Sequence, residues 1–173
     1  GKSTVADILL RFRDYGGSVT LGGVELRDLG GEAIRGLIAV VPQQPHLFNG
    51  TIRENILLGN PAAEEEQVRR AVRDAALAEW VDGLPLGLDT PVGEGGSAVS
   101  GGEARRIALA RALLKDAPVF LLDEPTEGLD FATEQRVIAA LANRTGGKTV
   151  LIISHRPACG DMAEQVHYFV KVT

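Results

Sequence analysis

The spacing of apolar residues along the first forty positions predicts a helix, then a hairpin, then a buried strand. After Thr4, apolar residues recur every three or four positions, which predicts an amphipathic helix. Two short segments, 19–21 and 24–26, flank Gly22-Gly23, a pair that favours a tight hairpin turn. The run 38–41 is short, apolar and β-branched, so we expect a strand buried on both faces.

The rest of the chain continues this alternation. Two more apolar runs, 119–122 and 149–153, predict buried strands, and 166–170 is a candidate terminal strand. Helices are expected at 64–80 (as one or two surface helices), 104–114 and 133–142. Parallel strands with helices between them predict an α/β fold with a parallel sheet flanked by helices and a small antiparallel β region near the N-terminus. The stretch of about 43–115 is the candidate helical subdomain.

Composition narrows the class of protein. The chain has 173 residues, 45% of them hydrophobic and 24% charged, which suits one folded domain and excludes wholesale disorder. With a net charge of −5, the chain lacks the excess of positive charge that is typical of proteins that bind duplex nucleic acid, so no nucleic-acid partner is expected. The single cysteine, Cys159, excludes an internal disulfide framework. No apolar run approaches the ~18 residues that would span a bilayer.

The chain opens with Gly1-Lys2-Ser3-Thr4, which has the sequence of the second half of a phosphate-binding loop. Backbone N–H groups at a helix N-terminus favour an anion, Lys2 would supply charge to the β- and γ-phosphates, and Ser3 could ligate Mg²⁺. The alternative is an ordinary helix start. This opening also predicts that the chain is a fragment, lacking the start of the loop and an upstream transmembrane domain, and that alone it binds ATP poorly and aggregates.

A second candidate element is the acidic pair at the end of the 119–122 strand. Asp123 and Glu124 would lie at the carboxyl edge of the sheet, where α/β proteins bind ligands. Asp123 would hold Mg²⁺, and Glu124 would orient the attacking water or accept a proton from it. A solvated strand end is the alternative.

A third element is Ser100-Gly101-Gly102-Glu103, which precedes the helix expected at 104–114. Ser100 and Glu103 have the spacing of a capping box. Glycine in the first turn of a capped helix also lets backbone N–H groups approach a phosphate closely. The two interpretations are compatible.

The order of these motifs resembles that of ABC-transporter nucleotide-binding domains, over nearly the whole chain 1–173. The residues that carry the resemblance are Lys2-Ser3-Thr4, Gln43, Ser100-Gly101-Gly102-Glu103, Leu121-Leu122-Asp123-Glu124-Pro125-Thr126, Gly128-Leu129-Asp130 and His155. The resemblance implies a P-loop NTPase core, with ATP and Mg²⁺ as cofactors and ATP hydrolysis as the activity.

The resemblance also implies roles for individual residues. The segment Gly1–Thr4 corresponds to the end of the Walker A loop, and Asp123 and Glu124 to the Walker B aspartate and the catalytic glutamate. Gln43 is similar to the Q-loop glutamine, which touches Mg²⁺ and the attacking water and couples to the membrane domain. His155 resembles the switch histidine that contacts the γ-phosphate.

A second nucleotide-binding domain is the partner that the family resemblance implies. Ser100, Gly101 and Gly102 would meet the γ-phosphate of a nucleotide held by that partner domain. Asp130 resembles the D-loop aspartate across the same dimer interface. ATP would then join the two domains, and hydrolysis would release them.

Further segments resemble the exporter branch. Residues 43–56 are similar to the exporter-type segment after the Q-loop, and 90–96 to the X-loop, whose glutamate, here Glu94, lies near the coupling helices of a transmembrane domain. An irregular glycine loop is the alternative for 90–96. The implied location is the cytoplasmic face of the bacterial inner membrane.

The segments 93–96 and 125–130 are most similar to CydC, the partner of CydD in the CydDC exporter. That resemblance implies export of thiols (cysteine, glutathione) or haem, linked to cytochrome bd assembly. The alternatives are another ABC exporter (lipid, drug or peptide), a soluble ABC ATPase acting on nucleic acid, or a degenerate, non-enzymatic half-site. Val99, Glu103 and Glu127-Gly128 depart from the common family pattern, the last replacing Ser-Ala.

Overall fold

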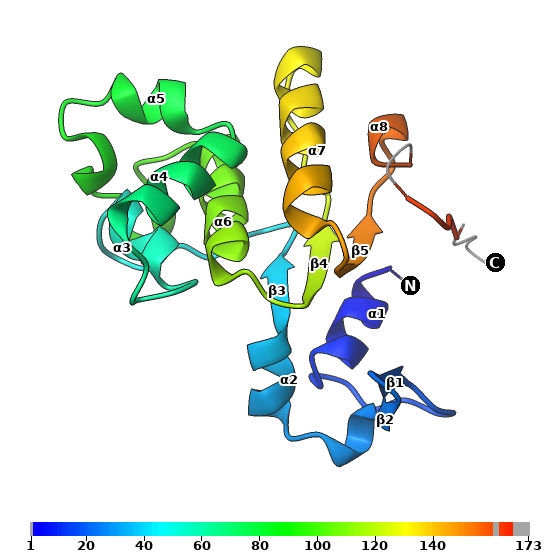
Figure 1. Cartoon of the computed structure of the whole chain (residues 1–173). Coiled ribbons are helices and arrows are strands. Elements are labelled where there is room, and N and C mark those ends of the chain that lie inside the picture. The colour runs from blue at the N-terminus through cyan, green and yellow to red at the C-terminus, as the bar shows by residue number, and fades with distance from the viewer. Residues whose placement is uncertain (1, 161–162, 168–173) are drawn as a thin grey trace.

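The centre of the fold is a parallel sheet. The computed structural model describes residues 2–160 and 163–167. Within them three strands pair in the order β3-β4-β5 (Figure 1): β3 (Ile38–Val41), β4 (Val119–Asp123) and β5 (Thr149–Ile153). The pairing is in register from Ile38, Val119 and Thr149 onward. All three strands therefore end at the same edge of the sheet.

Alternate residues of β4 enter two separate hydrophobic cores. Phe120 and Leu122 belong to the larger core, and Leu121 belongs to the smaller one. All three side chains are fully buried. Burial on both faces is typical of parallel sheets, because helices cover each side, and it explains why the strand is a continuous apolar run.

Helices cover both faces of the sheet. Their bounds are α1 (Lys2–Leu9), α2 (Gly31–Leu37), α3 (Ile52–Leu57), α4 (Glu65–Asp74), α5 (Ala78–Asp82), α6 (Gly101–Lys115), α7 (Phe131–Thr145) and α8 (Pro157–Gly160), with 3-10 helices η1 (Leu26–Asp28), η2 (Gly87–Asp89) and η3 (Glu94–Gly96). Figure 1 shows α3 to α6 grouped on one side of the sheet and α1 on the other. A two-stranded hairpin lies beside α1: β1 (Thr20–Leu21) and β2 (Val24–Glu25).

The structure confirms most of the predicted elements and corrects their lengths. The three apolar runs are strands, and Gly22 and Gly23 turn the hairpin with φ of 59° and 83°. The region 64–80 contains two helices, while α2 and α3 have no counterpart among the predictions. In the predicted terminal strand 166–170, Val166 and His167 are irregular and 168–170 lie outside the described residues.

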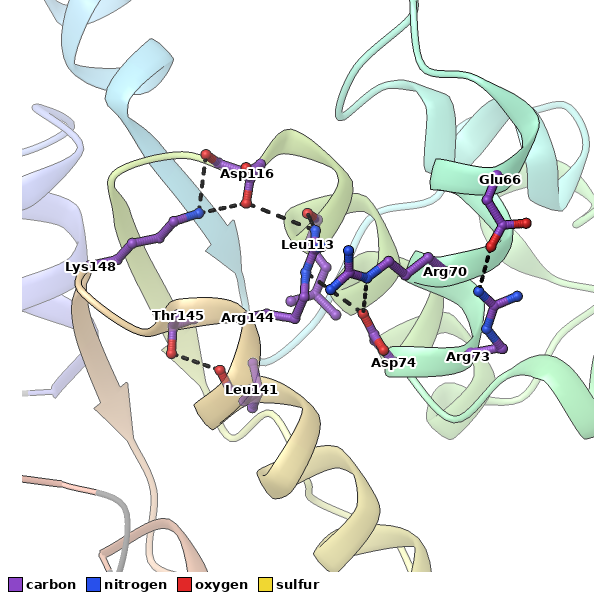
Figure 2. Close-up of polar contacts among 10 residues, drawn as sticks. All are labelled: Glu66, Arg70, Arg73, Asp74, Leu113, Asp116, Leu141, Arg144, Thr145 and Lys148. Carbon is purple, nitrogen blue, oxygen red and sulfur yellow. Dashed lines mark hydrogen bonds and ion pairs between the residues drawn. The ribbon is translucent and has the colours of Figure 1, made fainter.

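A cluster of polar contacts fastens the end of α7 to the helices beside it (Figure 2). Arg144 donates to the carbonyl of Leu113, at 3.0 Å, and lies 3.7 Å from an oxygen of Asp74 on α4. Asp116, just after α6, accepts from Lys148 at 2.5 Å. These contacts connect α7 to α4 and α6, and the end of α6 to the residue before β5, so they hold α6 and α7 at fixed positions.

Candidate functional site

Four of the candidate residues lie at the carboxyl ends of the three parallel strands. Gln43 comes two residues after β3, Asp123 ends β4, Glu124 follows it, and His155 comes two residues after β5. Because Val41 pairs with Leu122, and Asp123 pairs with Ile153, these residues share one edge of the sheet. This is the edge where open α/β sheets bind their ligands.

Glu124 and His155 contact each other directly. The Oε1 atom of Glu124 lies 2.8 Å from Nδ1 of His155, and Ser154 Oγ donates to Oε2 at 3.1 Å. Glu124 is only 4% exposed, whereas the side chain of His155 is 69% exposed. The pair therefore consists of a sheltered carboxylate and a ring that is open to solvent and able to meet a ligand.

The backbone at Glu124 has a left-handed conformation, with φ of 51°. Its N–H donates to the carbonyl of Ile153 at 2.8 Å, which extends the β4–β5 ladder by one bond. Burial acts to raise the pKa of the Glu124 carboxyl, but hydrogen bonds from His155 and Ser154 and the electrostatic interaction with His155 outweigh it, so its pKa lies below the usual value. Glu124 is thus ionised at neutral pH.

A buried ion pair lies next to this site. Arg156 Nε is 2.7 Å from Oε1 of Glu134, and the same oxygen accepts from Thr126 Oγ1 at 2.8 Å. Arg156 also donates to the carbonyls of Thr126, at 3.1 Å, and Leu129, at 3.4 Å. The loop after β5 is therefore tied to the turn after β4 by side chains that are largely buried.

Gln43 is connected to the Glu124 turn through its backbone. The side chain of Gln43 is exposed, and its carbonyl accepts from Nη2 of Arg105 on α6 at 3.1 Å. Nη1 of Arg105 donates to the carbonyl of Glu127 at 2.7 Å, and Nη2 lies 3.1 Å from the Glu127 carboxylate. The side chain of Arg105 is only 15% exposed.

Ser100 and Asp130 cap the two long helices. The predicted capping box is confirmed, because Ser100 Oγ accepts from the Glu103 N–H at 3.3 Å and Glu103 accepts from the Ser100 N–H at 2.7 Å. Asp130 accepts from the Thr133 N–H at 3.0 Å. The Thr133 side chain, and after it the Thr133 backbone N–H, lowers the pKa of the Asp130 carboxyl below its usual value. Gly101, in the first turn of α6, is exposed, so that turn is open to a ligand.

A hollow of about 350 Å³ lies beside Asp130, and Trp80 and Arg106 are among the residues that line it. Burial lowers the pKa of the Arg106 guanidinium, and the charges of Glu103 and Asp130 oppose that shift. Arginine nevertheless stays protonated in proteins, so the hollow carries a positive charge on one wall.

The segment after Gln43 packs against the loop that carries Glu94. Val92 donates to the carbonyl of Gly50 at 2.9 Å, and Ile52 donates to the carbonyl of Thr90 at 3.0 Å. Glu94 is exposed at the start of η3. The two segments therefore form one continuous surface.

Phe48 projects from this surface. Its backbone is held at both ends by the buried Asn55, which accepts from its N–H and donates to its carbonyl, each at 2.9 Å. Arg111 donates to Asn55 Oδ1 at 3.0 Å and lies over the Phe48 ring. Although its backbone is so firmly held, the Phe48 side chain is 56% exposed.

The remaining candidates lie at the start of the chain. Gly1 is outside the described residues, and for Lys2 and Ser3 the structure describes the helical backbone but not the side chains. Thr4 lies in the first turn of α1 and is half-buried. The phosphate-binding and Mg²⁺ roles of Gly1–Thr4 therefore stay predictions.

Sequence reasoning missed Arg105, Glu134, Ser154 and Arg156, which hold the candidate residues in place. Arg156 directly follows His155, which was the one available signal. Glu134 lies in a helix of mixed polarity, and no sequence pattern distinguishes its buried carboxylate from an exposed one.

The described residues contain neither a membrane-spanning helix nor a cluster of metal-ligating side chains. In the part of the chain that the structure describes, no helix is long and apolar enough to cross a membrane. Among the same residues, no three His, Cys, Asp or Glu side chains gather as a metal site.

Comparison with known proteins places the chain in a family. Residues 1–127 match the family described as "ABC transporter". The chain is 44% identical to the ATP-dependent lipid A-core flippase of Vibrio cholerae, over 96% of this chain and 29% of the flippase. It is also 44% identical to the mycobactin import ATP-binding/permease protein IrtB of Mycolicibacterium thermoresistibile, with the same two coverages of 96% and 29%.

A solved structure agrees with these matches. A bacterial Atm1-family ABC exporter with ATP bound superposes with a TM-score of 0.86 and 39% identity, covering 90% of this chain and 27% of the exporter chain. The chain thus spans less than a third of the length of these relatives. It belongs to the ABC transporter family and resembles the nucleotide-binding domains of its exporters.

Proposed function

We propose that the chain is the ATP-binding and ATP-hydrolysing domain of an ABC exporter. The observation that carries this proposal is the sheltered Glu124 carboxylate, held by His155 and Ser154 at the carboxyl edge of the sheet. In phosphoryl transfer, catalysis depends mainly on positioning and on stabilising charge. An ionised, immobilised carboxylate can orient an attacking water, and the exposed His155 ring can contact the γ-phosphate.

The nucleotide and its metal would be held by residues from several elements. Backbone N–H groups at the start of α1, with Lys2, would cradle the phosphates, and Ser3, Gln43 and Asp123 would offer oxygen ligands of the kind that Mg²⁺ prefers. The half-buried carboxylate of Asp123 ends β4 on the same edge as Glu124, which fits this role. Bound Mg²⁺ would neutralise charge on the phosphate oxygens.

The test is the Glu124→Gln variant of the whole protein. The amide keeps the size of the side chain but loses the negative charge, so we expect ATP to bind normally and turnover to be abolished. Glu66→Gln, an exposed substitution on α4, is the control and should leave turnover unchanged. Normal turnover by Glu124→Gln would refute the role of Glu124.

Two partners follow from the same proposal. Ser100, Gly101, Gly102 and Asp130 would face a nucleotide or a surface of a second nucleotide-binding domain, because both helix N-termini are exposed. The transmembrane domain would dock around Phe48, on the surface formed by the segment after Gln43 and the loop that carries Glu94, at the cytoplasmic face of the membrane. Phe48→Ser should lower transport-coupled ATP hydrolysis while basal hydrolysis persists.

The transported substrate has two candidates. The relatives named above include a lipid A-core flippase and a mycobactin import protein, which favours a lipid or another large amphiphile. The segment 93–96 and the pair Glu127-Gly128 instead favour a CydC-type domain paired with CydD, which would export thiols or haem. Uptake of glutathione or of lipid A into inverted vesicles that contain the whole protein distinguishes the two.

A further inference from the structure

Arg105 contacts two loops that the proposed mechanism treats separately. Its guanidinium donates to the carbonyl of Gln43, on the loop after β3, and to the carbonyl of Glu127, on the turn after β4. The Glu127 carboxylate lies 3.1 Å from Nη2 and forms an ion pair with it. One side chain of α6 therefore connects both loops.

The same turn leads directly to the catalytic candidate. The N–H of Glu127 donates to the carbonyl of Glu124 at 3.2 Å. A chain of short contacts thus runs from Gln43 through Arg105 and Glu127 to Glu124. Arg105 thereby links the Gln43 loop to the turn that begins at Glu124.

The chemistry of these contacts requires arginine at this position. A guanidinium offers N–H donors in a fixed plane that hold both carbonyls while its charge pairs with the Glu127 carboxylate, whereas a lysine ammonium is a point charge on a flexible stem. The side chain of Arg105 is only 15% exposed and that of Glu127 is 40% exposed, so the pair lies at the border between the interior and solvent. The departure of Glu127 from the common family residue thus has a structural partner in Arg105.

We propose that Arg105 and Glu127 are positioning residues that hold the Gln43 loop at a fixed distance from Glu124. This proposal rests on the proposed ATPase function. Neither side chain is assigned a contact with ATP, so their loss should affect the chemical step and leave ATP binding intact. Misplacement of a reacting group by about 1 Å can lower a rate by about 100-fold.

The experiment measures kcat and KM for ATP in the whole protein carrying Arg105→Lys, Glu127→Gln or both. We expect kcat to fall by about 10- to 100-fold, with KM and the Kd for ATP changed by less than about twofold. Because both changes break one connection, the double variant should be no slower than Arg105→Lys. Arg73→Gln, which removes a surface arginine paired with the exposed Glu66, is the matched control and should keep the wild-type kcat.

The outcomes separate three cases. A wild-type protein that does not hydrolyse ATP would overturn the proposed function itself. Active wild type with unchanged kcat in both folded single variants would overturn only the positioning role, and so would a loss that appears wholly in KM. If Arg105→Lys does not fold, Glu127→Gln decides the question, because it removes one charge and keeps the backbone contacts of Arg105.

Discussion

The ion pair between Arg156 and Glu134 supports a quantitative prediction about stability. The side chain of Glu134 is only 7% exposed and that of Arg156 only 26%. In Arg156→Met the Glu134 carboxylate stays buried and loses its cationic partner, while the bond from Thr126 remains. Breaking one side of a buried pair in this way costs about 3–5 kcal/mol, because an uncompensated charge is left behind.

The double variant Arg156→Met/Glu134→Gln isolates the cause. With both charges removed, no carboxylate is left unpaired, and neutral replacements of buried pairs are often close to neutral in stability. We therefore expect the double variant to recover most of the loss, although Met cannot replace the bonds to the Thr126 and Leu129 carbonyls. Recovery in the double variant would separate the charge effect from lost packing.

Thermal unfolding of the purified protein by scanning calorimetry measures these differences. For a domain of this size, 1 kcal/mol shifts Tm by about 2–4 °C, so Arg156→Met should lower Tm by about 6–20 °C. Arg69→Met is the control, because its pair with Glu65 is exposed on α4 and contributes at most about 0.5 kcal/mol. Equal Tm losses in Arg156→Met and Arg69→Met, or no recovery in the double variant, would refute the reasoning.

Three further predictions concern other parts of the fold. Ser100→Ala removes the N-cap of α6 and should lower the free energy of unfolding by about 1 kcal/mol, whereas Ser100→Gly should lower it by only a few tenths of a kcal/mol. Equal losses of ATPase activity in the two variants would show that the Ser100 hydroxyl acts on the nucleotide. Gly59→Ala should lower the free energy of unfolding in urea by about 1–3 kcal/mol, because its Cβ would lie 2.2 Å from the Arg111 carbonyl oxygen. Gly36 lies on α2 with open space around it, so Gly36→Ala should raise the free energy of unfolding by up to about 1 kcal/mol. The pKa of Glu124 in the folded state lies below 4.5. The ionised carboxylate therefore contributes to the free energy of unfolding above pH 4.5, and this contribution is lost as the pH falls through the folded-state pKa. Urea unfolding of Glu124→Gln, measured over the same pH range, should lack this dependence.

The sequence was sufficient to predict the sheet because its strands have strong local signals. The strands β3 and β4 are largely buried on both faces, so their residues form uninterrupted apolar runs, as at Phe120-Leu121-Leu122. The strand β5 has the same apolar pattern although it is mostly half-buried. The short helix α3 has no such run over its six residues, and its local signal is the capping box that Thr51 and Glu54 form at its start. Phe12 fits the helical spacing after Thr4, yet it is 66% exposed because α1 ends at Leu9.

The site was predictable where function depends on residue type at a fixed spacing. Glu124 and His155 were named from their motifs, and the structure brings them into contact. Arg105 could not be found in this way, since its partner Glu127 is 22 residues away and neither has a local signal of contact. Long-range pairs of this kind depend on how α6 is placed beside the sheet.

The left-handed backbone at Glu124 places a stability penalty at a residue that the proposed reaction requires. Residues other than glycine adopt this conformation at a penalty of about 1–2 kcal/mol. A glycine at this position would relieve this penalty, yet it would also delete the carboxylate and the stability that its ionised form contributes. Relief of the backbone and retention of the carboxylate therefore exclude each other at this residue, and a demand for turnover retains glutamate.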